Sequence, residues 1–354
     1  MTVKNAQPRF SRDLLAGGLL LVALLVGIRR KQEFSSIGAA PIGDNALSRV
    51  TMRLLPEDWL VLGYLVVLEA AVLMGEGPRK TAAALITGGL LGVYLLLQTF
   101  AHSDARGGRF RETVRRISLA VGVIGTFVEL HYVLPTATQR SHDAALYAID
   151  LMMFGDEPAE AWERFVRPAT TEWFSFFYFN YYTLIIAFMV PFTFLVRPGK
   201  LLRAFSFGLL IVFCLGQIVY ILVPGYGPHI YLAGNFSRPL TGPFWWNLVH
   251  HAVEAGSVRG DIFPSLHTAV PTFLTLFAWR QRQHLVLRVV WFPLALVTSQ
   301  IVIATMFLRW HYAIDILAGI CLAVLAEWLG RRVASRETRS LPPIVWGPVV
   351  TVPD

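Results

Sequence analysis

The string FPSLH at residues 263–267 and the string HYAID at residues 311–315 each open a long apolar stretch near the C-terminal end of the chain. His267 and His311 are 44 residues apart, and the residues between them are mostly apolar. A helix needs about 20 residues to cross a bilayer, so this interval fits one helix across, a short turn and one helix back. The spacing therefore predicts that both histidines lie at the same face of a membrane.

Composition places the chain among membrane proteins. Of its 354 residues, 55% are hydrophobic and only 15% are charged, and the mean hydropathy is +0.54. A soluble domain would carry about 25% charged residues. The apolar residues come in blocks long enough to span a bilayer, which predicts an all-α, polytopic membrane protein. Cys214 and Cys321 both fall inside such blocks, where they are expected to be small packing residues and neither a disulfide nor a metal site.

Nine apolar segments are expected to form transmembrane helices, and the last six of them, which include the two histidine strings, are expected to form a six-helix core. We divide the chain into N-terminal accessory helices (1–112), this core (113–335) and a disordered cytoplasmic tail (336–354). The first segment has only 15 residues, so it either spans or lies at the interface. The segments are Leu14–Ile28, Trp59–Leu73, Ala82–Phe100, Ile117–Leu134, Trp173–Val196, Phe205–Val223, Ile262–Trp279, Leu285–Phe307 and Tyr312–Leu329.

The distribution of positive charge predicts the orientation. The net charge is +8, and most arginines and lysines flank apolar segments, so they indicate membrane anchoring and no nucleic-acid partner. Arginines are concentrated in the loops 103–116, 197–203 and 280–288 and in the tail, which are expected to be cytoplasmic. Both histidine strings begin at the opposite ends of their segments. The predicted active site therefore faces a periplasm, the cell exterior or an organelle lumen.

His311 and Asp315 are four residues apart, so on a helix they share one face. Asp315 could accept a hydrogen bond from one imidazole nitrogen, which fixes the tautomer and leaves the other nitrogen as a nucleophile or base. The alternative is a buried His–Asp pair that only links helices. Ionisable residues inside membranes are functional by default, and this favours the catalytic interpretation.

His267 follows Pro264 and Ser265 at the start of a predicted helix. The first turn of a helix presents unpaired amides and a positive dipole end, which suit a phosphate. Ser265 adds a hydroxyl donor, and His267 could protonate a departing alkoxide. The alternative is an ordinary helix start with proline and serine as capping signals. The order, the spacing and the shared face of the two histidine strings together favour a site for phosphoryl transfer on a lipid.

The two strings resemble the type-2 phosphatidic acid phosphatase superfamily. Residues 263–267 are similar to the inositol phosphorylceramide synthase branch, and Gly260-Asp261 together with residues 311–316 resembles sphingomyelin synthases. The close match covers about residues 256–320, and a looser match extends back to about residue 117. The resemblance implies that His311 attacks phosphorus, that Asp315 orients it and that His267 protonates the leaving group. It also implies a phosphohistidine intermediate, with no metal and no cofactor.

The sequence departs from the phosphatases of this superfamily in its phosphate-binding residues. Their Lys-x6-Arg-Pro motif is reduced to Arg238-Pro239, with Tyr231 in the lysine position, and Thr305 replaces the arginine six residues before the nucleophilic histidine. These losses favour the synthase branch. The remaining candidates for binding substrate or phosphate, beside Ser265, are Arg259, Arg309, Asp261, Arg238 and Tyr226.

The leading functional prediction is a lipid phosphotransferase that moves a phospho-headgroup, such as phosphoinositol, from a phospholipid to an alcohol. The first alternative is a lipid phosphate phosphatase acting on phosphatidate or polyprenyl phosphates. A non-catalytic channel or transporter is the remote alternative. Its expected signs are charges within spans or repeated, broken helices, whereas this sequence shows no inverted repeat and its ionisable residues cluster at one membrane face. The expected partners are lipids in the membrane, and the oligomeric state is left open.

Overall fold

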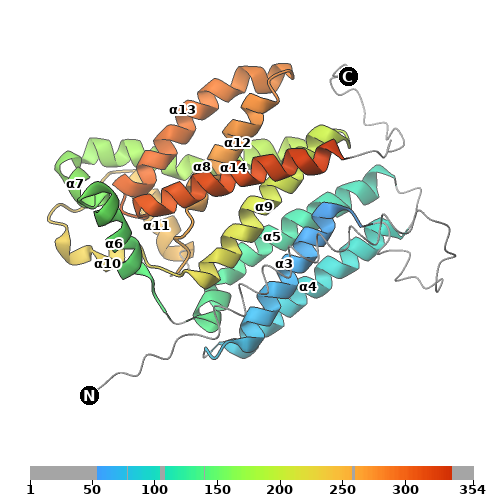
Figure 1. Cartoon of the computed structure of the whole chain (residues 1–354), viewed down its shortest axis with the longest axis horizontal. Helices are drawn as coiled ribbons and strands as arrows, with labels where there is room; N and C mark the ends of the chain where they lie inside the picture. The colour runs from blue at the N-terminus through green and yellow to red at the C-terminus, as the bar shows by residue number, and fades with distance from the viewer. Residues whose placement is uncertain (1–53, 78, 104–107, 139, 257–259, 337–354) are drawn as a thin grey trace.

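A computed structural model describes residues 54–336, apart from residues 78, 104–107, 139 and 257–259. The described part of the chain is all-helical, which confirms the predicted fold class (Figure 1). The predicted segment Leu14–Ile28 and nearly all of the predicted tail lie outside the described residues. The helices are α3 (Pro56–Met74), α4 (Lys80–His102), α5 (Arg109–Ala137), α6 (Asp143–Phe154), α7 (Pro158–Ala161), η1 (Trp162–Phe165), α8 (Pro168–Phe194), α9 (Lys200–Leu222), α10 (Pro228–Tyr231), η2 (Ala233–Asn235), α11 (Trp245–Gly256), α12 (Leu266–Arg280), α13 (Leu285–Phe307) and α14 (Ala313–Ser335).

Five of the described helices are long and apolar enough to cross a membrane: α4, α8, α9, α13 and α14. A sixth is α5, if its two pieces, which meet at an angle of 56°, count as one span. The all-α class is therefore confirmed, whereas the nine spans and the six-helix core are not. Within its 19 residues α3 carries three acidic side chains, and α12 has only 15 residues, so neither has the length and composition of a typical span.

The central element is α9, which contacts α3 and α5 on one side and α12 and α14 on the other (Figure 1). Most of its side chains between Leu202 and Ile221 are buried. Close approach to α14 depends on a glycine, because a Cβ at Gly330 would lie 2.4 Å from the carbonyl oxygen of Ala204. The long helices thus pack around α9 as a bundle whose core lies along this helix.

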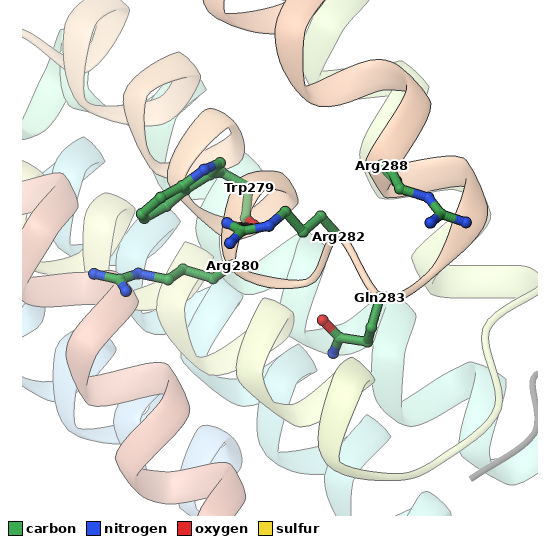
Figure 2. Close-up of a pocket in the computed structure, with 5 residues that line it drawn as sticks. All are labelled: Trp279, Arg280, Arg282, Gln283 and Arg288. Carbon is green, nitrogen blue, oxygen red and sulfur yellow. Dashed lines mark hydrogen bonds between the residues drawn. The ribbon is translucent and has the colours of Figure 1, made fainter.

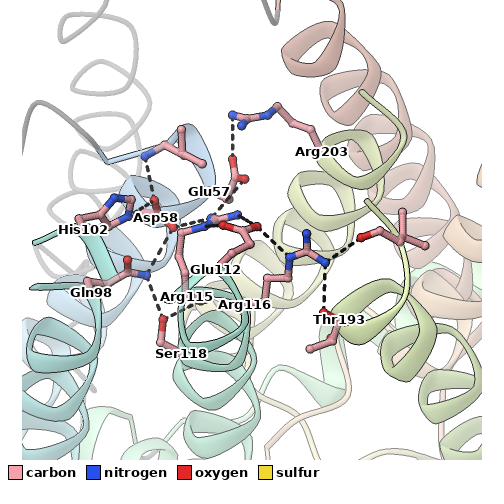
Figure 3. A network of polar contacts seen from close by, with 12 residues as sticks. Glu57, Asp58, Gln98, His102, Glu112, Arg115, Arg116, Ser118, Thr193 and Arg203 are labelled. Carbon is pink, nitrogen blue, oxygen red and sulfur yellow. Dashed lines mark hydrogen bonds and ion pairs between the residues drawn. The ribbon is translucent and has the colours of Figure 1, made fainter. Parts of the chain in front are cut away.

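A buried ionic network joins α3, α4, α5 and α9 at one end of the bundle (Figure 3). Arg115 lies at its centre, with Nη1 2.9 Å from Asp58, and it also pairs with Glu57 and Glu112. Arg203 of α9 pairs with Glu57 at 3.3 Å. Because charges buried without a partner are costly, this network fixes how the N-terminal helices pack against the rest of the molecule.

The short helices lie in the loops at the end of the bundle where α12 and α14 begin (Figure 1). In the sequence these loops are 135–170 and 225–261, for which no helix was predicted. The first of them contains α6, whose Asp143 and Asp150 are both fully buried. These loop helices surround the ends of α12 and α14 that carry the two histidines.

Candidate active site

His267 and His311 come together at this end of the bundle, with their ring centroids 6.2 Å apart. His267 stands in the first turn of α12, and His311 lies in the turn between α13 and α14. The two helix starts are tied directly, because the backbone N–H of Ser265 donates to the carbonyl of Asp315 over 3.1 Å. At this separation both imidazoles are within reach of a single phosphate group.

Asp315 contacts His311 as the spacing of the two residues predicted. Its Oδ2 lies 3.3 Å from Nδ1 of His311 and accepts a hydrogen bond from the backbone N–H of Tyr312 over 2.9 Å. That second bond closes the first turn of α14, because Asp315 is the third residue of the helix. The carboxyl group is fully buried, so its interaction with the imidazole is little screened by water.

Burial lowers the pKa of His311 to about 4, against a backbone hydrogen bond with Ile262 that raises it. The ring is therefore neutral across the physiological range, which is the state that a nucleophilic imidazole needs. With one ring nitrogen facing Asp315, the tautomer that carries its proton there leaves the other nitrogen with a lone pair.

Several buried polar atoms near the histidines have no hydrogen-bond partner within the described residues. They are Oγ of Ser265, Nε2 of His267 and Oδ1 of Asp315. Ser265 is the residue that precedes α12, but its side chain does not cap the helix. Buried polar groups are normally hydrogen-bonded. Unsatisfied donors and acceptors gathered at one place fit a site that binds a polar group such as a phosphate.

Tyrosines of α8 enclose His267. The ring of Tyr178 stacks on the imidazole at 4.4 Å with an interplanar angle of 16°, and Tyr181 lies at 4.2 Å. Tyr182 meets it edge-on at 6.2 Å. The residues 178, 181 and 182 fall on one face of the helix, so the pattern is visible in the sequence. Its association with His267 could be seen only in the fold, because the three tyrosines lie more than 80 residues earlier in the chain.

Two aspartates of α6 support the turn that carries His311. Asp150 accepts hydrogen bonds from the backbone N–H groups of Ala313 and Ile314 at 2.6 and 2.9 Å. Asp143 accepts one from the hydroxyl of Tyr312 at 3.0 Å. The two bonds to Asp150 satisfy the first amides of α14, which would otherwise lack partners. They were missed in the sequence, because an Asp pair seven residues apart carries no sign of the helix that it will cap.

Glu157 lies beside Asp150 in this support. Burial, together with the nearby carboxylate of Asp150, raises the pKa of Glu157 to about 8. Burial also raises the pKa of Asp150, against the two amide hydrogen bonds that lower it. A protonated Glu157 beside Asp150 avoids the repulsion between two buried carboxylates.

The predicted arginines have other contacts in the structure. Arg309 has a left-handed backbone with φ of 67°, and its guanidinium lies 3.8 Å from the ring centroid of Phe236. It also donates to the carbonyl of Arg238 over 2.8 Å and lies 3.5 Å from Glu163. The side chain of Arg238 donates to the carbonyl of Arg164. Both arginines thus hold loops together around the His311 turn, and their binding of phosphate stays a prediction.

For the remaining predicted residues, the structure shows no hydrogen bond or ion pair with the two histidines within its described part. Asp261 precedes α12, and burial raises its pKa to about 7. Tyr226 is on the surface, and its backbone N–H donates to Asp143 over 2.8 Å. Arg259 lies outside the described residues. The structure therefore brings together His267, His311, Asp315 and Ser265. Of the predicted arginines that it describes, Arg238 and Arg309 contact other groups.

Residues 144–329 match the model of the PAP2 superfamily, and this range is more than half of the chain. The chain belongs to the PAP2 superfamily. Membership supports lipid phosphate chemistry of the phosphatase or phosphotransferase type, carried out by an integral membrane protein. No curated protein and no solved structure shows a significant match to the chain. The matched range includes both histidine strings and α6 but begins after α5, so α3 to α5 are additional to the PAP2 region.

Proposed function

We propose that this PAP2 protein is a lipid phosphotransferase, which moves a phospho-headgroup from a phospholipid to an alcohol through a phosphohistidine on His311. The observation that carries the proposal is the pair of imidazoles with centroids 6.2 Å apart, one of them 3.3 Å from a buried carboxylate. The site would face the non-cytoplasmic side, because arginines concentrate at the opposite ends of the helices.

In the first step, the free ring nitrogen of His311 attacks phosphorus, and the bond from phosphorus to the leaving oxygen breaks. His267 gives its proton to that oxygen, so the donor lipid leaves as a neutral alcohol. Asp315 balances the positive charge that develops on the imidazole of His311. In the second step, the acceptor hydroxyl attacks phosphorus and gives its proton to His267, and the phosphorus–nitrogen bond breaks.

Transfer to an alcohol is favoured over transfer to water because, in the described part of the chain, the candidate arginines near the site are engaged with other groups. Arg309 and Arg238 are engaged with Glu163 and backbone carbonyls. A phosphomonoester carries more negative charge than a phosphodiester, so it needs more positive partners. The described site supplies chiefly the Ser265 hydroxyl and the two imidazoles. This set suits a phosphodiester donor better than a phosphate monoester.

The proposal is tested with purified protein and phospholipid labelled in the headgroup phosphate, with and without added alcohol acceptors. We expect a labelled product lipid that forms only when the acceptor is present. Release of labelled inorganic phosphate without any lipid product would overturn transfer in favour of the phosphatase alternative. The variant His311→Ala should abolish both reactions, and turnover that survives in it would overturn the site itself.

A further inference from the structure

The turn between α12 and α13 forms a basic pocket at the opposite end of α12 from His267. The pocket has a volume of about 480 Å³ and is lined by Trp279, Arg280, Arg282, Gln283 and Arg288 (Figure 2). Arg280 ends α12, Arg282 belongs to the turn and Arg288 stands on α13. Arginines from two helices and their connection therefore line one concave surface.

These three arginines have no acidic partner within the part of the chain that the structure describes. The end of α14 differs, because Arg331 there pairs with Glu327 at 2.6 Å. An arginine whose charge is met inside the protein has little to offer a ligand, whereas an unpaired cluster attracts anions. The pocket thus holds an excess of three positive charges that the fold itself does not balance.

Trp279 holds two of the guanidinium groups in place. The guanidinium carbons of Arg280 and Arg282 lie 4.7 and 4.9 Å from the centroid of the indole ring. Arg282 also donates to the carbonyl of Trp279 over 3.2 Å. Cation–π contact restricts the side chains before any ligand arrives, which lowers the entropy lost on binding.

The length of α12 places this pocket at the depth of lipid headgroups. Its 15 residues extend about 22 Å, while the hydrocarbon core of a bilayer is about 30 Å thick. The turn after α12 therefore does not project far into water. Guanidinium groups at such a depth need anionic partners, and phosphates of the lipid headgroups are the ones available there.

The surface beside the pocket is apolar. Leu285, Val286 and Val289 begin α13, and each exposes more than 60% of its surface. They lie on the lipid-facing side of the predicted bundle, next to Arg288 in the sequence. A phospholipid with its phosphate in the basic pocket could lay an acyl chain along these side chains, which would bury apolar surface.

We propose that the α12–α13 turn binds the phosphate headgroup of an anionic phospholipid, in the leaflet opposite the active site. Arginine suits this ligand because its planar fork matches phosphate oxygens. The site is separate from His267 and His311 and does not depend on the proposed reaction. Through α12, whose other end carries His267, the bound lipid would brace the helix that holds the active site.

The experiment measures lipid binding to the purified full-length chain by native mass spectrometry, with phosphatidylglycerol or phosphatidylcholine added. We compare the wild type with the triple variant R280Q/R282Q/R288Q. We expect the triple variant to bind phosphatidylglycerol about tenfold more weakly, which corresponds to the loss of about one charge-assisted hydrogen bond. Binding of phosphatidylcholine should not change. Lipid bound in the active site contributes equally in both proteins, so the difference between their affinities for phosphatidylglycerol reports binding at the pocket.

The matched control is R331Q/R332Q/R336Q at the end of α14, which removes the same charge from the end of another long helix. It also includes a tryptophan-stacked arginine, since Arg332 lies 4.8 Å from the ring of Trp328. The control should bind phosphatidylglycerol within twofold of the wild type. Equal losses in both triple variants, or no loss in either, would overturn the site.

Two further measurements keep the test decisive. Inorganic phosphate is added in place of lipid, and binding or thermal stabilisation as strong as with phosphatidylglycerol would overturn the assignment to a lipid. If the triple variant does not purify as a folded protein, the single variant R282Q is used, because Arg282 is exposed. It should weaken phosphatidylglycerol binding at least threefold, and wild-type binding in it would contradict the proposal.

Discussion

At the scale of single residues, the account depends on the negative charge of Asp315. We predict that Asp315→Asn lowers kcat by about 10²- to 10⁴-fold, because a neutral amide cannot balance the charge that develops on His311. An amide oxygen in the same place can still accept from Tyr312 and preserve the start of α14. The measurement is kcat together with the melting temperature of each protein.

Comparing kcat with the melting temperature shows whether Asp315 acts through its charge or by stabilising the fold. We expect the melting temperature of Asp315→Asn to stay within a few degrees of the wild type. Wild-type turnover in this variant would contradict the orienting role of Asp315. Loss of folding together with activity would show that Asp315 serves mainly as a cap of α14.

The low pKa of His311 predicts the acidic side of the pH profile. Its folded value of about 4 lies below the ordinary value of 6.5, so the ring stays neutral and nucleophilic until the pH falls to about 4. We therefore expect the acidic limb of kcat/KM to have its midpoint well below 6.5. The measurement is kcat/KM against pH, which reports groups of the free enzyme. A midpoint at or above 6.5 would show that His311 does not set this limb.

Local spacing predicted part of the site. The His311–Asp315 contact follows from helical periodicity, and the approach of His267 to His311 follows from the length of a helical hairpin between them. The contacts of Asp143, Asp150 and the α8 tyrosines could not be predicted in this way. They join residues more than 80 positions apart, and their partners are backbone amides or ring faces that leave no pattern in the sequence.

At the scale of helices, the approach of α14 to α12 determines how the two histidines meet. A Cβ at Gly319 would lie 2.6 Å from the carbonyl oxygen of Ser265, next to the active site. We predict that Gly319→Ala pushes the two helix starts apart and lowers kcat at least tenfold, since small displacements of reacting groups are costly. The measurement is kcat alongside the melting temperature.

Gly330→Ala provides the matched control on the same helix. Its Cβ would lie 2.4 Å from the carbonyl oxygen of Ala204, at the end of α14 away from the histidines. We expect both variants to lose stability but only Gly319→Ala to lose most of its kcat. Equal kcat losses in both would mean that general destabilisation, and not the geometry of the site, limits activity.

Helix positions followed the apolar segments closely, with Leu285–Phe307 matching α13 to the residue. The number of described helices long and apolar enough to span a membrane, however, is smaller than the nine that were predicted. In α3, Glu57 and Asp58 form ion pairs inside the bundle, so the helix is apolar only on average. Helix α12 begins later than predicted because residues 261–265 form a loop before it. The loop helices were missed because they are short and are held by contacts with distant segments.

At the scale of the whole molecule, the ionic network around Arg115 attaches α3 to α5 to the PAP2 region (Figure 3). We predict that Arg115→Met destabilises the protein by about 3–5 kcal/mol, because it leaves buried carboxylates without their partner. The measurement is thermal or denaturant unfolding of the purified protein. Arg336→Met is the control, since Arg336 is an exposed arginine at the end of α14, outside the network. Equal stability of the two variants would mean that the network does not hold the helices together.

The arrangement of helices around α9 could not be predicted from the sequence. Hydropathy predicts that a segment is buried in lipid or protein, but it does not say which helices meet. The partners of α9 are selected by small residues such as Gly330, which allow close approach, and by Arg203, which pairs with Glu57 of α3. The roles of Gly330 and Arg203 can be identified only when the residues that face them are known.

The central claim is that His311 becomes covalently phosphorylated during turnover. The most direct measurement is mass spectrometry of the protein quenched at neutral to alkaline pH within the first turnovers on a phospholipid, with the modified residue mapped by fragmentation. The account predicts a phospho-group carrying the donor's headgroup on His311 of the wild type, and none on this residue in Asp315→Asn at the same time points. Turnover without any adduct, or an adduct on another residue, would contradict it.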